Sequence, residues 1–172
     1  QDSDAYIRSA EEWLPIPGSI DAIARFCRAG STVAVATNQS GLSRGYFDLD
    51  DLEAIHQQQR AQVAEKAGHI AGLFYCPHLP DEGCDCRKPA TGLLQAIEAE
   101  LGQPLAGSYF IGDSLKDLQA ARAMQCQPVL VLTGKGEQTQ AQLQAADVAI
   151  TDPEPITIYP DLAAAAQALV EP

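Results

Sequence analysis

The sequence predicts an α/β fold in which a doubly wound parallel sheet is covered by helices on both faces. From Ser19 onward, segments with helical periodicity alternate with short apolar runs that have the length of buried strands. The runs at 32–37 and 128–132 are apolar on both faces, which is typical of strands inside a parallel sheet. Regular alternation of strand and helix predicts right-handed crossovers between parallel strands.

The helical periodicity and the short apolar runs locate the individual elements in chain order. Ile20, Ile23 and Cys27 share one face of the first expected helix, and Gly30 ends it. We expect helices at 19–29, about 48–67, 91–101, 115–125, 137–145 and from 161 onward, and strands at 32–37, 70–76, 108–112, 128–132 and 147–150. The length suits one domain spanning residues 1–172, with no large cap domain.

The composition limits which kinds of partner the protein can bind. The 172 residues include 11 Lys and Arg against 23 Asp and Glu, a net charge of -12. This charge disfavours nucleic acid and anionic membrane surfaces, both of which would repel the protein. Because no apolar run reaches the roughly eighteen residues of a membrane span, we expect a cytoplasmic protein, and we expect it to be a monomer.

Three of the five cysteines gather in one loop at residues 76–86. The pattern Cys76-x-His78-x5-Cys84-x-Cys86 supplies four soft ligands as two close pairs, which suits tetrahedral Zn2+. With all four positions filled by protein, the zinc would be structural, since no position is left for a catalytic water. The alternative is a chance cluster of reduced thiols. An odd number of cysteines argues against a disulfide framework, and we interpret the other two, Cys27 and Cys126, as small buried hydrophobic residues.

Polar residues follow the expected strands, where ligands bind in a parallel sheet. Thr37 ends one strand, and Asp113 follows another with Asp117 one helical turn further on. A hydroxyl can donate to a phosphoryl oxygen, and a carboxylate commonly holds Mg2+. The plainer alternatives are an ordinary turn after residue 37 and a helix cap at Asp113 or Ser114.

The zinc loop leads directly into two cations, Arg87 and Lys88. A loop pinned by a metal would present these side chains rigidly beside the active edge of the sheet, which suits a phosphate ligand. His56 and His69 have no ligand partner nearby in sequence, and we expect both to be structural or solvated.

Thr37, Lys88 and Asp113, in this order along the chain, resemble the second, third and fourth motifs of the haloacid dehalogenase (HAD) superfamily of phosphotransferases. The stretches DAYIRSAEEWLPIPGS, ATNQSGLSRGYF, CPHLPDEGCDCRKP and GDSLKDLQAA look like those of the D-glycero-D-manno-heptose 1,7-bisphosphate phosphatases, which make heptose for bacterial lipopolysaccharide. Histidinol-phosphate phosphatase domains share the zinc loop and TNQ, but SRGYF and EEWLPIPGS favour the heptose branch.

The resemblance implies a small phosphorylated sugar as substrate and hydrolysis of its 7-phosphate through an aspartyl-phosphate. It implies that Thr37 and Lys88 stabilise the phosphoryl group, that Asp113 binds catalytic Mg2+, and that the zinc is structural. The residues that it places against the substrate are Asp2, Ser3, Asp4, Tyr6, Asn38, Gln39, Ser40 and Arg87.

The first motif of the superfamily, Asp-x-Asp-Gly at the end of a hydrophobic strand, has no counterpart in these residues. DSD at 2–4 has the spacing but no strand before it, so we do not assign Asp2 as the nucleophile. We expect the 172 residues to be inactive by themselves, and about a dozen to fifteen further residues to supply the motif on a central strand. That strand would lie between those ending at Thr37 and Gly112, and direct pairing of these two strands would contradict the hypothesis. The alternatives are a histidinol-phosphate phosphatase and a non-catalytic, zinc-stabilised module that binds a phosphorylated sugar or a protein.

Overall fold

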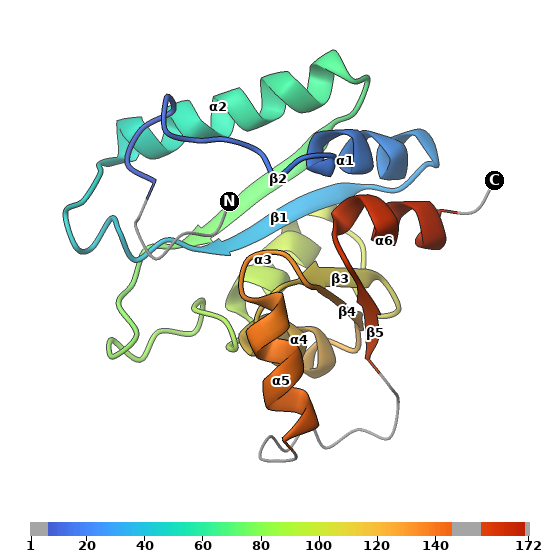
Figure 1. Cartoon of the computed structure of the whole chain (residues 1–172). Coiled ribbons are helices and arrows are strands. Elements are labelled where there is room, and N and C mark those ends of the chain that lie inside the picture. The colour runs from blue at the N-terminus through green and yellow to red at the C-terminus, as the bar shows by residue number, and fades with distance from the viewer. Residues whose placement is uncertain (1–6, 146–155, 171–172) are drawn as a thin grey trace.

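The computed structural model describes residues 7–145 and 156–170, which form alternating helices and parallel strands (Figure 1). In chain order the elements are α1 (Ser19–Arg28), β1 (Val33–Asn38), α2 (Leu49–Glu65), β2 (Ile70–Cys76), α3 (Gly92–Leu101), β3 (Tyr109–Gly112), α4 (Leu115–Ala123), β4 (Gln127–Val131), α5 (Gly136–Gln144), β5 (Thr157–Tyr159) and α6 (Leu162–Leu169). The predicted α/β class is confirmed.

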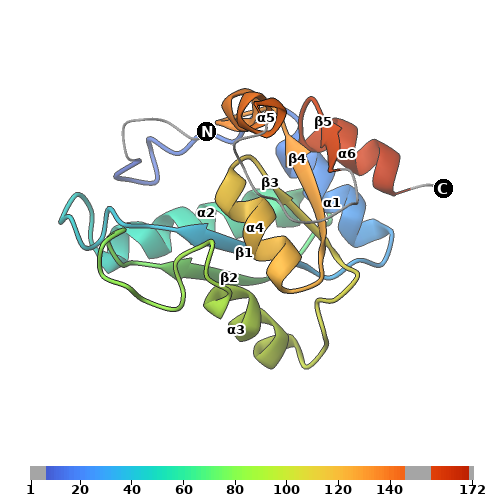
Figure 2. The same cartoon turned by 90° about the horizontal axis from the view of Figure 1, so that it is seen from below.

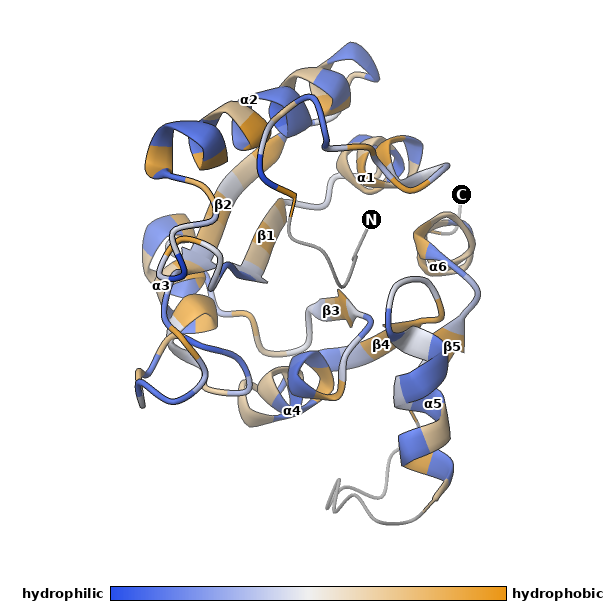
Figure 3. Cartoon of the chain, turned by 60° about the vertical axis from the view of Figure 1, so that its left-hand side comes forward, coloured by the Kyte–Doolittle hydropathy of each residue, from blue (hydrophilic) through white to orange (hydrophobic). Residues whose placement is uncertain are grey.

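The strands form two half-sheets. One contains β1 and β2, and the other contains β3, β4 and β5 in that order, with every pairing parallel. Among the described residues, β1 and β3 do not pair with each other, so the refolded sheet that would contradict a central strand is not formed. Figure 3 shows β1 and β3 as the facing edges of the two half-sheets.

Helices pack on both faces and join the half-sheets (Figures 1 and 2). On one face, Phe26 of α1 and Ala166 of α6 belong to a buried cluster that contacts Val33 of β1 and Ile111 of β3. A second cluster on α3 and α4 contacts both half-sheets on the other face; it includes Leu93, Leu94, Ala120 and Ala121, packed against Ala36, Phe74 and Phe110. Apolar burial is the main driving force for this packing, so the two clusters fix the relative positions of the half-sheets.

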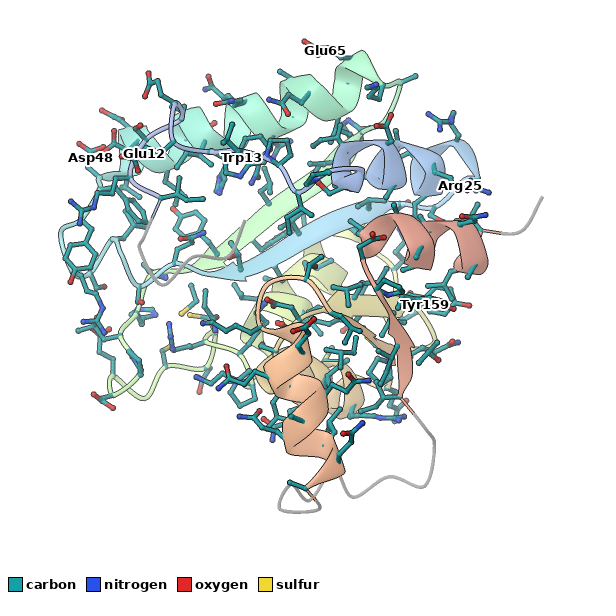
Figure 4. The ribbon with its side chains drawn as sticks, in the orientation of Figure 1. Glu12, Trp13, Arg25, Asp48, Glu65 and Tyr159 are labelled. Carbon is teal, nitrogen blue, oxygen red and sulfur yellow. The ribbon has the colours of Figure 1, made fainter. Side chains whose placement is uncertain are left out.

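Reciprocal capping boxes set where α2 and α4 begin. Asp48, at one end of α2 in Figure 4, accepts a hydrogen bond from the backbone N–H of Asp51, and Asp51 accepts one from the backbone of Asp48. Ser114 and Asp117 form the same reciprocal arrangement at α4. Such capping boxes satisfy backbone donors that a helix start leaves without partners. Of the two cap candidates at α4, Ser114 is therefore the cap and Asp113 is not.

Some expectations differ from the structure or fall outside it. Strand β5 was not predicted, because three residues carry almost no periodic pattern. The strand expected at 147–150 lies outside the described residues. Cys126 is buried as expected, but the interpretation of Cys27 is wrong in part, since its thiol is half-buried against the backbone of His69. Within the described segments, no helix combines the length and apolarity that crossing a membrane requires.

Candidate active site

A cavity of about 1430 Å³ lies between the two half-sheets, and we call it the β1–β3 cavity. Its walls include every residue of β1 and of β3. β4, which has a partner on each side, buries four of its five residues, whereas all of β1 is only half-buried. Among the described residues, the cavity therefore separates two strand edges that have no second strand beside them, unlike strands inside a sheet.

Thr37, Lys88 and Asp113 all line the β1–β3 cavity. Thr37 lies near the carboxyl end of β1, and Asp113 follows the last residue of β3. Lys88 comes from the loop after β2, but its Nζ lies 2.7 Å from the carbonyl oxygen of Ala36 in β1. A hydroxyl, an ammonium group and a carboxylate are thus placed at the same edge of the fold, as the sequence predicted.

Lys88 is held by a buried ion pair. Its Nζ lies 2.6 Å from Oδ1 of Asp117, and the two side chains are only 10% and 7% exposed. The other carboxylate oxygen of Asp117 accepts hydrogen bonds from the backbone N–H and the hydroxyl of Ser114. Gly112 makes room for this arrangement, because a Cβ there would lie 2.5 Å from the Cβ of Asp117. Lys88 therefore spans the two half-sheets, from β1 to α4.

Asn38 fixes the backbone of the same lysine. Its Nδ2 donates to the carbonyl oxygen of Lys88 at 3.2 Å, and its Oδ1 accepts from the Lys88 N–H at 3.1 Å. Both ends of the amide are thereby engaged with one residue. Asn38 was expected to line the substrate, and it does line the cavity, but the contacts seen here hold Lys88 in place.

Asp113 is contacted from α5, which lies 22 or more residues further along the chain. The backbone N–H of Lys135 donates to Oδ2 of Asp113 at 2.9 Å, and the hydroxyl of Thr139 donates to the Asp113 carbonyl oxygen at 2.8 Å. Sequence reasoning missed both contacts, because nothing in a local pattern indicates which residues of α5 face the end of β3.

The four predicted zinc ligands meet at the end of β2 and in the loop that precedes Lys88. The ligand atoms of Cys76, His78, Cys84 and Cys86 all lie within 4.8 Å of one another, and close contacts among them measure 3.2–3.6 Å. A tetrahedral site with Zn–S bonds of about 2.3 Å places its ligand atoms roughly 3.5–3.8 Å apart. The donor set and spacing therefore fit one Zn2+, and the cluster is the one such group that the described residues contain.

The electrostatics of the cluster also favour a metal. Burial raises the pKa of the Cys84 thiol, but hydrogen bonds from the backbone of Arg87 and from the other thiols outweigh that effect and lower it to about 7. Burial, followed by contacts with Cys76 and Cys84, raises the pKa of Cys86 to about 12. Sulfur atoms this close repel one another once charged, and a divalent cation removes that conflict.

The zinc loop is connected to the two cations that follow it. Nη1 of Arg87 donates to the carbonyl oxygen of His78 at 3.0 Å, which ties the arginine to the loop. Nε of Arg87 is buried and makes no hydrogen bond within the part of the chain that the structure describes. Arg87 also lines the β1–β3 cavity next to Lys88, so a rigid loop here fixes both side chains.

The remaining predicted site residues are placed less specifically. Gln39 and Ser40 line the cavity; Nε2 of Gln39 lies 3.3 Å from the Thr37 hydroxyl, and Ser40 is buried. Asp2, Ser3, Asp4 and Tyr6 lie outside the described residues. The two histidines other than His78 do not belong to the zinc cluster: His56 is buried against Tyr75, and His69 is exposed.

Comparison with protein families agrees with this geometry. A family model described as HAD-hydrolase-like matches residues 85–165. The D-glycero-beta-D-manno-heptose-1,7-bisphosphate 7-phosphatase of Pseudomonas aeruginosa is 54% identical over 170 residues, covering 99% of this chain and 91% of that protein. The phosphatase of the same name from Pseudomonas putida is 55% identical, covering 98% of this chain and 92% of that protein.

Solved structures show the same relationship. The crystal structure of D,D-heptose 1,7-bisphosphate phosphatase from B. bronchiseptica, complexed with magnesium and phosphate, has a TM-score of 0.89 and 47% identity, and covers 98% of this chain and 90% of that one. The corresponding phosphatase from Burkholderia thailandensis has a TM-score of 0.71 and 35% identity, with 95% and 90% covered. The fold and site thus define a HAD-like hydrolase. Within that class, the chain belongs to the family of the heptose 1,7-bisphosphate phosphatases.

Proposed function

We propose that this protein is a Mg2+-dependent phosphatase that removes the 7-phosphate of D-glycero-β-D-manno-heptose 1,7-bisphosphate during heptose biosynthesis. The observation that carries the proposal is the fixed ammonium group of Lys88 at the cavity edge that Thr37 and Asp113 also line. The choice of substrate, including the β anomer, rests on the relatives, which cover nearly the whole chain. Those relatives do not favour the histidinol-phosphate alternative.

In this proposal, the chain's own residues bind and neutralise the phosphoryl group. Phosphoryl transfer requires mainly positioning and stabilisation of charge on the phosphoryl oxygens. Lys88 supplies a positive charge whose position is set by Ala36 and Asp117, so little reorganisation is needed during the reaction. Thr37 supplies a hydroxyl donor from the end of β1.

The attacking carboxylate, we propose, is carried by a strand that occupies the β1–β3 cavity and comes from residues outside these 172. Parallel strands on both sides would pair with it, and its carboxyl end would lie beside Lys88. A carboxylate oxygen there would attack phosphorus as the bond to the sugar oxygen breaks, and a second carboxylic acid would protonate that oxygen. Water would then hydrolyse the aspartyl-phosphate. Intact mass spectrometry of the natural protein tests this, because such a strand adds roughly one to two kilodaltons to the 18.3 kDa of these residues.

Asp113 fits a role in holding Mg2+. Its carboxylate lies at the carboxyl end of β3 and lines the cavity, and carboxylate oxygen is the donor that Mg2+ prefers. Mg2+ is usually held by one or two carboxylates together with substrate phosphate and water, so one carboxylate from this chain and one from the proposed strand form a sufficient set. When bound, the metal would contribute positive charge near the phosphoryl oxygens.

The rest of the substrate would contact the residues around this centre. We propose that Arg87 recognises the substrate with the free side of its guanidinium group, which its bond to His78 orients. Gln39, Ser40 and the segment containing Asp2, Ser3, Asp4 and Tyr6 would contact the sugar. Zn2+ on the four-ligand cluster would be structural, since protein atoms fill a tetrahedral shell.

We further propose that the protein acts as a monomer in the cytoplasm on this small substrate alone. All five cysteines are free thiols, which suits a reducing compartment. The net charge of -12 opposes binding to nucleic acid or anionic lipid.

The direct test is phosphate release by the natural protein from the β and α anomers of the heptose bisphosphate and from histidinol phosphate under matched conditions. The expected result is preferential hydrolysis of the β anomer, with the 1-phosphate retained in the product. Preferential hydrolysis of histidinol phosphate would overturn the substrate assignment. Tight binding of the bisphosphate without any phosphate release would instead favour a non-catalytic binding module.

A further inference from the structure

Asp113 is fixed by an element that follows it by more than twenty residues. α5 begins after β4, yet its first residues approach the end of β3, where the Lys135 N–H and the Thr139 hydroxyl donate to Asp113. The bond from Lys135, the N-cap residue of α5, reaches the carboxylate, and the bond from Thr139 within α5 reaches the backbone carbonyl.

The contact made by Thr139 is unusual for a threonine inside a helix. Such a hydroxyl commonly bonds to a carbonyl one turn earlier in its own helix. Here it crosses to a different loop, at 2.8 Å, and the side chain is only 3% exposed. Since a buried hydroxyl without a partner is costly, the bond to Asp113 is what makes a polar residue acceptable at this position.

α5 is itself placed tightly against the sheet. A Cβ at Gly136 would lie 1.9 Å from the carbonyl oxygen of Val131 in β4, so only glycine allows the helix to begin this close. Ser114, the residue after Asp113, is fixed in turn by the capping box of α4. The peptide that carries the Asp113 carboxylate is therefore clamped between the starts of two helices.

We propose that Thr139 is a positioning residue for Asp113 and that its hydroxyl sets the affinity of the site for Mg2+. The inference rests on the proposed function, in which Asp113 holds the metal. Thr139 acts through the Asp113 carbonyl oxygen: with the bond in place the peptide between residues 113 and 114 cannot rotate, and the carboxylate keeps one orientation toward the cavity. Groups that orient metal ligands typically change metal affinity by about ten- to a hundredfold when removed.

The test uses three substitutions in the natural protein. Thr139→Val keeps the shape and removes the hydroxyl, Thr139→Ser keeps the hydroxyl, and Thr91→Val is the control, because the Thr91 hydroxyl bonds to Gln95 on α3 and does not line the cavity. Mg2+ is titrated into each protein by calorimetry, and the same proteins are assayed for phosphate release over a range of Mg2+ concentrations.

Thr139→Val is expected to weaken Mg2+ binding about tenfold and to raise the Mg2+ concentration for half-maximal activity equally, while kcat at saturating Mg2+ changes little. Thr139→Ser is expected to restore binding, and Thr91→Val to leave it unchanged. Mg2+ affinity of Thr139→Val within twofold of the original protein would overturn the inference. If that variant does not fold, Thr139→Ala replaces it with the same expectations.

Asp113→Asn separates this inference from the function on which it rests. If Asp113→Asn leaves Mg2+ binding intact, the metal assignment itself is wrong. If Asp113→Asn abolishes binding while Thr139→Val does not weaken it, the metal assignment stands and the positioning role of Thr139 is refuted.

Discussion

Replacing Asp117 by asparagine removes the charged partner of a buried ammonium group. Oδ1 of Asp117 lies 2.6 Å from Nζ of Lys88, and the two side chains are 7% and 10% exposed. Asparagine has nearly the same shape and can still accept from Ser114, but it cannot balance the charge of Lys88. The ammonium group keeps the carbonyl oxygen of Ala36 and its position over the Phe110 ring, neither of which carries a full negative charge.

Breaking a buried pair by removing one partner typically costs about 3–5 kcal/mol, because the remaining charge stays desolvated. We expect the lower end for Asp117→Asn, about 3 kcal/mol, since the Ala36 carbonyl oxygen still solvates Lys88 in part. With a urea dependence of about 2 kcal/mol per molar, the unfolding midpoint should fall by about 1.5 M. Equilibrium urea unfolding of the zinc-loaded protein measures this shift.

Asp21→Asn is the matched control within the same chain. Asp21 pairs with Lys66 at 3.2 Å, but these side chains are 65% and 53% exposed. Exposed pairs contribute at most about 1 kcal/mol, so this midpoint should hardly move. If the midpoint falls no further for Asp117→Asn than for Asp21→Asn, the buried pair does not stabilise the protein as proposed.

Further predictions concern the proposed zinc and Mg2+ ligands and the buried histidine. Cys84→Ser should lose bound zinc and thermal stability together, since metal binding contributes to the folding free energy. The control variant Cys27→Ser should still bind zinc at the four-ligand cluster. Zinc analysis and thermal melts measure both properties, and full zinc retention in Cys84→Ser would contradict a structural site. Asp113→Asn should leave the urea midpoint nearly unchanged while it weakens Mg2+ binding and abolishes phosphate release. Full activity of this variant would contradict the assignment of Asp113 as a Mg2+ ligand. Burial lowers the pKa of His56 from 6.5, so the unfolded chain binds more protons in acid and the unfolding free energy falls as pH drops through that range. Urea unfolding at about pH 7.5 and 5.5 should show a smaller loss for His56→Gln than for the original protein, and equal losses would contradict this.

Local patterns were sufficient to predict most of the fold. Helical and strand periodicity located the elements to within a few residues, because each repeats its apolar positions over one or more turns or alternations. β5, with three residues, offers too short a pattern to detect. The separation into two half-sheets could be anticipated only from the resemblance, which required a strand between those ending at Thr37 and Gly112.

Some parts of the candidate site could also be predicted from local sequence patterns, and others could not. The zinc cluster was predictable because its four ligands lie within eleven residues and their spacing already suits a tetrahedral ion. The partner of Lys88 was not, because Asp117 is 29 positions away and reaches the lysine only through the packing of α4 against β3. The contact between Thr139 and Asp113 was hidden for the same reason, since it depends on the approach of α5 to the end of β3.

The sequence also left the role of Asn38 open. The family resemblance placed Asn38 against the substrate, but its amide bonds to both backbone groups of Lys88. A pattern at the end of a strand identifies residues near a site without separating those that touch the substrate from those that position its neighbours. That distinction requires the partner of each polar atom.

In the proposed mechanism, this chain supplies the phosphoryl-binding residues and a carboxylate on a strand in the β1–β3 cavity supplies the nucleophile. Phosphate release from the β-heptose bisphosphate tests it most directly, measured for residues 1–172 alone and for the same residues preceded by an apolar strand that ends in Asp-x-Asp. We expect phosphate release only when the strand is present, and none when the first aspartate of that strand is replaced by asparagine. Equal release by residues 1–172 alone, or by the asparagine variant, would contradict it.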